Sequence, residues 1–202
     1  MPIRVSSTAF FRYLAAQSTT RVSKVREAKK MVMTPAEDYK RVDYWKTLRE
    51  ESIRFLTGSS NSREFSTAIE GVTDEKKVSN YKASAAGLRR WLGRKRVTAQ
   101  AVQSVIWSHA GLEVVVAPEL ILSWPGGGPY VVKLYFSADP LSKYLANPML
   151  RLLEQTHGRL GIAAILDTQQ SKLYTGPTAR PTDLDLLLST EAASYVSMWN
   201  SV

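Results

Sequence analysis

The sequence predicts an α+β protein with a helical N-terminal half and a C-terminal half that contains the sheet. As far as about Gly111, apolar residues recur at helical spacing, with capping residues before them and glycines after them. Beyond Leu112 the pattern changes to short β-branched and aromatic runs separated by proline and glycine, which is typical of strands and turns. Hydrophobic residues make up 44% of the 202 positions, which is enough for the core of one domain, or of one domain with a helical extension.

The N-terminal half is expected to consist of helices. The first covers residues 7 to about 31, and the serine and threonine run at 18–20 divides it in two. Thr34 caps the next helix, Pro35 suits its first position and Glu37 completes a capping box, so this helix should run to about residue 56. Three more helices follow, each ending close to a glycine, and they are expected at residues 63–70, 73–92 and 98–109.

The C-terminal half is expected to form the sheet and the helices that pack on it. Three β-rich runs with turn residues between them predict an antiparallel meander at residues 113–117, 120–124 and 130–136. The run at 160–167 is so apolar that it should be a strand buried on both faces. The other elements are a helix, a short strand and a last helix, expected at residues 139–156, 172–174 and 181–199.

Positive charge is concentrated in the N-terminal half. The net charge is +9, and residues 1–100 hold 21 Lys and Arg against 10 Asp and Glu, whereas residues 101–202 hold 6 against 8. We therefore expect a basic helical region at residues 1–96 and an α/β core with a C-terminal helix at residues 97–202. Such asymmetry favours nucleic acid, DNA or RNA, as the partner, because each neutralised phosphate releases counterions. A solvated surface that only aids solubility is the alternative.

Several classes of protein are excluded by what the sequence lacks. Without cysteine the chain can form no disulfide, no thiolate zinc site and no cysteine nucleophile. No apolar run approaches the roughly 20 residues that a membrane span needs, and the first residues do not resemble a signal peptide. The expectation is a cytoplasmic protein that has no membrane partner and no cofactor.

The clearest binding feature is a basic cluster around Trp91, at the end of the helix expected at 73–92. Five cations in this cluster can grip successive phosphates while Trp91 packs in the core. Their alternative role is to compensate the dipole of the helix C-terminus. The basic cluster consists of Arg89, Arg90, Arg94, Lys95 and Arg96. A second basic run would extend this surface if the first helix docks nearby, and it consists of Arg21, Lys24, Arg26, Lys29 and Lys30.

Two short motifs lie within the expected order of helix, three strands, helix and strand between residues 98 and 174. Pro118-Glu119 precedes the second strand, and Val131-Val132-Lys133 lies on the third. This half of the chain resembles the core of the PD-(D/E)XK nuclease superfamily. The resemblance implies that an acid before the second strand and an acid-x-Lys on the third bind Mg²⁺ and position a water against the scissile phosphate. Glu119 and Lys133 match this pattern, whereas Val131 departs from it because valine cannot ligate a metal.

Three functions remain open. The leading one is a nucleic-acid-binding protein with a degenerate, inactive nuclease-like core, since a single carboxylate holds a metal weakly against phosphate repulsion. Glu119 and Lys133 would then be a cross-strand ion pair. The second is an active Mg²⁺-dependent nuclease, in which Glu119 is a metal ligand, Glu119 and Lys133 are catalytic, and a relocated acid completes the site. The candidates for that acid are Glu113, Asp139 and Glu154. The third is a protein-protein adaptor whose basic half meets an acidic partner in a larger complex.

Overall fold

The computed structural model describes residues 2–34 and 43–202 and confirms the α+β class. The helical N-terminal half is followed by strands and a C-terminal helix, and the described strands form two mixed sheets. The expected capping box at Thr34, Pro35 and Glu37 lies largely outside the described residues. The helix that it was expected to begin is present from Lys46 onward.

The N-terminal segment is a short strand followed by two helices. β1 (Ile3–Ser6) leads into α1 (Ser7–Ala15), and α2 (Ser18–Met33) follows after two extended residues, which confirms the expected break. Ser6 caps α1 by accepting a hydrogen bond from the Ala9 amide at 3.2 Å. The apolar face of α1 is buried against the small sheet and α7.

The small sheet has the strand order β1-β4-β3 and contains a segment that was expected to be helical. β3 (Val105–His109) and β4 (Leu112–Val116) form an antiparallel hairpin, and β1 pairs with β4 in parallel. The predicted helix at 98–109 is therefore wrong. Its apolar residues have helical spacing, but its β-branched residues pair with strands from elsewhere in the chain, and this pairing overrides local propensity.

The large sheet has the strand order β2-β5-β6-β7-β8. β6 and β7 are parallel, and the other neighbouring pairs are antiparallel. The predicted meander is wrong in its first strand: β4 belongs to the small sheet, and β5 pairs instead with β2, which precedes the β3–β4 hairpin in the chain. The bounds of the strands are Thr98–Gln100 for β2, Leu120–Trp124 for β5, Gly127–Tyr135 for β6, Ile162–Asp167 for β7 and Lys172–Thr175 for β8.

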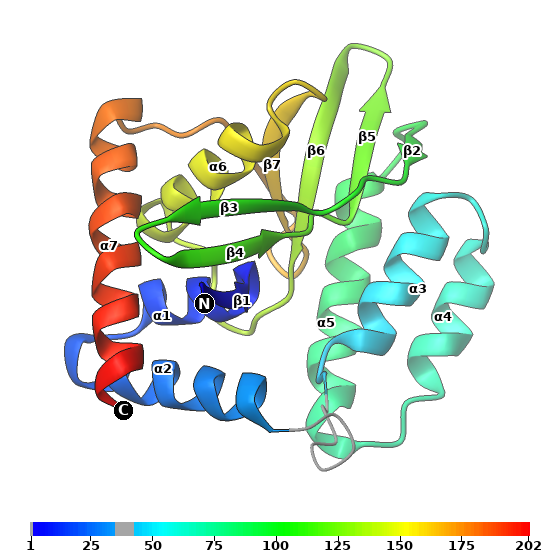
Figure 1. The fold of residues 1–202 in the computed structure, drawn as a ribbon. Coiled ribbons are helices and arrows are strands. Elements are labelled where there is room, and N and C mark those ends of the chain that lie inside the picture. The colour runs from blue at the N-terminus through cyan, green and yellow to red at the C-terminus, as the bar shows by residue number, and fades with distance from the viewer. Residues whose placement is uncertain (1, 35–42) are drawn as a thin grey trace.

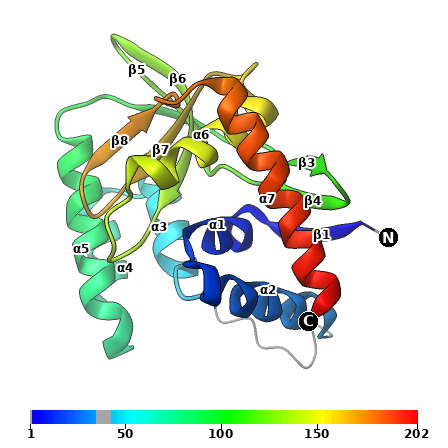
Figure 2. The same cartoon turned by 90° about the vertical axis from the view of Figure 1, so that its left-hand side faces the viewer.

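Helices cover both faces of the large sheet (Figures 1 and 2). One face packs against α3 (Lys46–Leu56), α4 (Ser62–Glu70) and α5 (Glu75–Leu92) and forms one hydrophobic core. The other face packs against α6 (Lys143–His157) and forms a second core, which also includes the small sheet, α1, α2 and α7 (Pro181–Ser201). β7 contributes alternate residues to the two cores, which confirms that this strand is buried on both faces.

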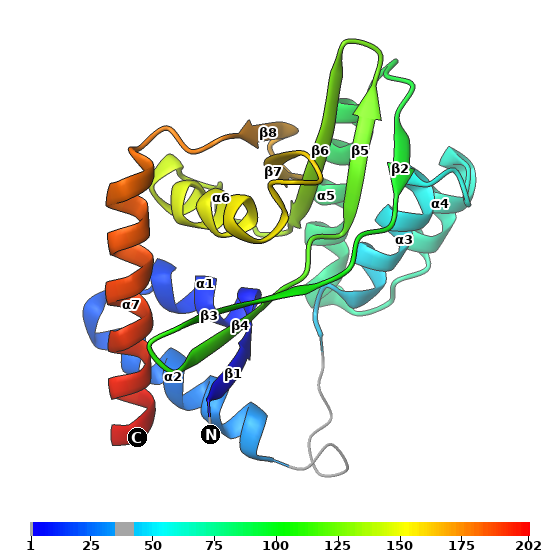
Figure 3. The same ribbon diagram turned by 45° about the horizontal axis from the view of Figure 1, so that its top comes forward.

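The two cores divide the chain differently from the expected boundary at residue 96. β1, α1 and α2 pack with the small sheet and α7, whereas α3, α4 and α5 pack on the large sheet (Figure 3). The N-terminal residues reach this position because β1 pairs with β4, more than 100 residues later in the sequence.

Candidate nucleic-acid interface

The basic cluster is placed by a close contact between α5 and the turn that follows β7. At Gly87 an added Cβ would lie 1.9 Å from the Thr168 carbonyl oxygen, so only glycine allows this approach. The Ser171 hydroxyl donates to the Gly87 carbonyl oxygen at 2.9 Å. Gly93 then ends the helix with a left-handed φ of +50°. An isolated glycine inside a helical pattern costs about 1 kcal/mol relative to alanine, so Gly87 was the local sequence signal of a packing constraint.

Two members of the basic cluster serve the fold. Arg89 donates a hydrogen bond to the Ser66 hydroxyl and lies 5.3 Å from the ring of Phe65, so it joins α5 to α4. Lys95 donates to the Trp91 carbonyl oxygen and lies 5.0 Å from the Trp91 ring, which places a cation at the end of the helix dipole. Trp91 itself is only 6% exposed and is a core residue, as expected.

Arg90, Arg94 and Arg96 are the free members of the cluster. All three are exposed, and none forms an ion pair or a side-chain hydrogen bond with any residue that the structure describes. The sequence contains no aspartate or glutamate between Glu75 and Glu113, so no acid neighbours them along the chain. These guanidinium groups therefore present unneutralised positive charge to the solvent.

Three of the five cations in the second basic run have partners within the protein. Arg21 pairs with Glu191 at 3.0 Å and lies over the ring of Tyr13. Lys24 pairs with Glu27 at 3.1 Å, and Lys29 donates to two carbonyl oxygens at the end of α7. In the described part of the chain, only Arg26 and Lys30 of this run are exposed without an ion pair.

The contacts between Arg21, Glu191 and Tyr13 also shift the pKa of Tyr13. Burial raises the pKa of its phenol, and the hydrogen bond that its hydroxyl donates to Glu191 at 2.8 Å raises the pKa further. These contacts hold α2 against α1 and α7, at the opposite end of the molecule from the last turn of α5 (Figure 1). The second run therefore does not extend the surface of the basic cluster.

Glu119 and Lys133 lie together as an ion pair between the two sheets. The register places Leu120 opposite Val132, and the Lys133 ammonium donates to Glu119 Oε1 at 2.6 Å and to the Ala117 carbonyl oxygen at 2.9 Å. Glu119 Oε2 accepts a hydrogen bond from the Leu134 amide at 2.7 Å. The side chain of Glu119 is 5% exposed and that of Lys133 is 16% exposed. The pair therefore holds the segment that follows β4 against the β5–β6 hairpin.

The carboxylate of Glu119 is held by donors of the protein. Both carboxylate oxygens of Glu119 already accept hydrogen bonds from the protein, and Val131 is fully buried on the face that also carries Lys133. In residues 2–34 and 43–202, no three carboxylate or imidazole groups come close enough to hold a metal. Of the candidate acids, Glu113 pairs with Arg4 at 2.7 Å, Glu154 pairs with Arg151 at 3.2 Å, and Asp139 is exposed after β6.

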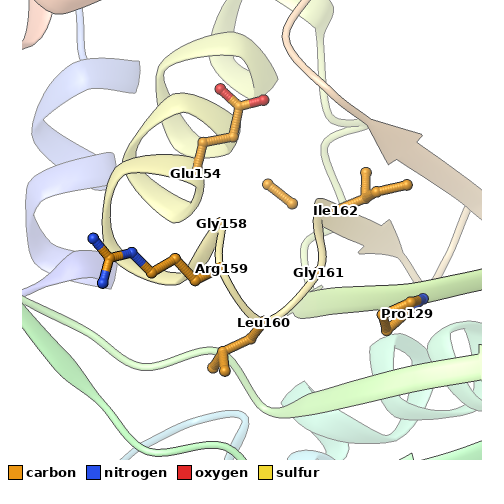
Figure 4. A pocket seen from close by; sticks show the side chains of 8 residues that line it. Pro129, Glu154, Gly158, Arg159, Leu160, Gly161 and Ile162 are labelled. Carbon is orange, nitrogen blue, oxygen red and sulfur yellow. The ribbon is translucent and has the colours of Figure 1, made fainter.

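A shallow pocket lies where α6 ends and β7 begins (Figure 4). Its volume is about 460 Å³, and neither Glu119 nor Lys133 lines it. Glu154 and Arg159 extend in different directions in Figure 4, so the pocket has no converging polar groups of the kind that orient a small ligand. The full lining is Pro129, Glu154, Gly158, Arg159, Leu160, Gly161, Ile162 and Ala163.

Comparison with models of known protein families finds none that matches this chain, and comparison with curated proteins finds no significant relative. Across the two described ranges, no helix is both long and apolar enough to cross a bilayer. The functional conclusions therefore depend on the residues and the geometry of this chain.

Proposed function

We propose that this protein binds nucleic acid through Arg90, Arg94 and Arg96, on a nuclease-like core that has lost catalytic activity. The observation that carries the proposal is that three exposed cations without an ion pair in the described chain lie within seven residues of one another. Elsewhere in the described chain, ten ion pairs join cations to acids, but no member of the basic cluster takes part in one. Exposed cations that pair with no acidic side chain of the described protein are available to bind phosphates. Neutralisation of each phosphate releases counterions.

The likeness to a PD-(D/E)XK core is part of the same proposal. On the large sheet the order from α5 onward is helix, strand, two-stranded hairpin, helix and strand, with the β3–β4 hairpin inserted after the first strand. Glu119 and Lys133 occupy the motif positions and hold each other, so they act as a structural pair in this proposal. We expect phosphate binding to be independent of Mg²⁺, because the described residues contain no group of three acids or imidazoles that could hold the ion.

A charge-matched pair of variants tests the binding surface. The triple variant Arg90→Ala, Arg94→Ala, Arg96→Ala removes the three free cations of the basic cluster. The control, Arg12→Ala, Arg26→Ala, Lys30→Ala, removes three exposed cations of α1 and α2 that form no ion pair in the described chain, so the change in net charge is the same. Fluorescence anisotropy with labelled duplex DNA at several salt concentrations measures the affinity and its salt dependence.

We expect only the cluster variant to lose most of the affinity. Three phosphate contacts contribute a slope of about −2.7 to a plot of log affinity against log salt, so the slope should flatten by about that amount. Equal losses in both triple variants would remove the basic cluster as the binding surface. Isothermal titration with Mn²⁺ should show no saturable binding at low millimolar concentration, and one-to-one binding that is lost in Glu119→Ala would support the nuclease instead.

The adaptor function makes a different prediction for the same surface. An acidic peptide partner would be recognised by its carboxylates, so polyglutamate would displace labelled DNA at a similar concentration of charge. We expect DNA to bind more tightly than polyglutamate, because a duplex has a high linear charge density and releases condensed counterions at each phosphate contact. Tighter binding of polyglutamate would favour the adaptor.

A further inference from the structure

The aromatic rings at the basic cluster pack against one another. Trp91 is buried, and its ring meets the ring of Trp124 edge to face, with centroids 5.7 Å apart and an interplanar angle of 84°. Trp124 in turn stacks on Tyr130, at 4.8 Å and 18°. The Lys95 ammonium lies above the Trp91 ring. The tryptophan inside the cluster and the two rings beyond it thus form one packed series.

Backbone atoms also cover the indole of Trp124. A Cβ added at Gly127 would lie 2.4 Å from Trp124 Nε1 and 2.6 Å from its Cε2, so the first residue of β6 lies directly against this ring. Trp124 therefore has Trp91, Tyr130 and the chain at Gly127 around it. On the face that Tyr130 covers, a base could stack only if Tyr130 moved away.

The free arginines have the opposite character. Arg90 lies in the last turn of α5, while Arg94 and Arg96 follow Gly93 in the turn that leads to β2. They are exposed and unpaired within the described chain, and they bracket a buried tryptophan. The surface thus offers three cations for phosphates, whereas Trp91 is buried and the partly exposed rings of Trp124 and Tyr130 stack on each other.

We infer that this surface binds the backbone of double-stranded nucleic acid and that no base stacks on it, an inference that rests on the proposed function. Proteins that bind single strands obtain much of their affinity from bases stacked on aromatic side chains. Where phosphate contacts act alone, affinity follows the charge density of the polyanion. A duplex carries one charge per ~1.7 Å of axis, against ~3.4 Å for each of its strands.

The expected preference follows from the number of free cations. With three contacts, the salt slope is about −2.7 for a duplex and about −2.1 for a single strand. The difference of about 0.6 corresponds to about fourfold tighter duplex binding at about 0.1 M salt, if the two affinities converge at about 1 M. The ratio should shrink as salt rises, because the preference is wholly electrostatic.

Duplex DNA and oligothymidine of equal length, each labelled, test the inference with the wild-type protein. Anisotropy gives both affinities across a salt series, and tryptophan emission followed in the same titrations reports stacking. The expected result is tighter duplex binding, with tryptophan emission unchanged on addition of oligothymidine. Equal or tighter binding of the single strand would overturn the inference, as would quenching that disappears in Trp124→Phe.

The outcomes distinguish a failure of this inference from a failure of the proposed function. If neither ligand binds, or if the cluster variant and its control bind equally well, the proposed function fails. If binding depends on the three arginines but favours oligothymidine and quenches tryptophan, the proposed function stands and only the duplex assignment fails.

Discussion

Substituting alanine for Gly87 should destabilise the protein, although the same change stabilises most helices. Gly87 lies inside α5, two residues before the basic cluster begins at Arg89, and its Cα faces the turn after β7. The added methyl would lie 1.9 Å from the Thr168 carbonyl oxygen, whereas ordinary Cβ contacts begin at 3.4 Å. Either the helix or the turn must therefore move by more than an ångström.

Two opposing effects set the magnitude. Alanine is favoured over glycine in a helix interior by about 1 kcal/mol. The turn cannot retreat freely, because the amide and hydroxyl of Thr168 both donate to the Tyr135 carbonyl oxygen, at 3.2 and 3.1 Å. Breaking these bonds costs about 1 kcal/mol each, and overpacking costs about 1–3 kcal/mol more, so the net loss of unfolding free energy is about 2–4 kcal/mol.

Urea unfolding followed by circular dichroism measures this loss. Ala83→Gly is the control, because Ala83 is exposed on the same helix and its replacement should cost only about 1 kcal/mol of helix propensity. In Gly87→Ala the displaced α5 should also weaken nucleic-acid binding. A Gly87→Ala protein as stable as the wild type would refute the reasoning, since the close contact with Thr168 would then not exist.

Three further substitutions test the interior. Lys133→Met leaves the Glu119 carboxylate buried without its cation and should lower the unfolding free energy by about 3 kcal/mol, with partial recovery when Glu119→Gln is added; a loss below about 1 kcal/mol in urea unfolding would show a solvated pair. Val131→Glu places an unpaired charge at a fully buried position, so we expect loss of the cooperative thermal transition and no gain in Mn²⁺ binding by calorimetry. Burial raises the pKa of Tyr195 to about 12, and its hydroxyl has no hydrogen-bond partner among the described residues, so Tyr195→Phe should not destabilise the protein at neutral pH. Because the folded pKa is the higher one, the neutral phenol's contribution is complete below the ordinary pKa of about 10 and is lost as pH rises towards 12, so Tyr195→Phe should resist alkaline unfolding better than the wild type.

Much of the secondary structure could be predicted because its signals are local. The break between α1 and α2, the helices that end at Gly71 and Gly93, and the buried character of β7 follow from caps, glycines and hydrophobic pattern. The segment at 98–109 could not be predicted, because its apolar spacing fits a helix while its partners, β4 and β5, lie further along the chain. Pairing with distant strands decided its conformation.

The sequence by itself determined the composition of the basic cluster and its place at a helix end, since both depend on neighbouring residues. Only the tertiary structure decided which cations remain free. Arg21 and Lys29 have the same charge as Arg90, but residues more than 160 positions away on α7 hold them. Folding brings these cations to their partners, and the sequence alone does not show which residues become neighbours. The same holds for Gly87, whose requirement for glycine arises from a turn that reaches α5 only in the folded protein.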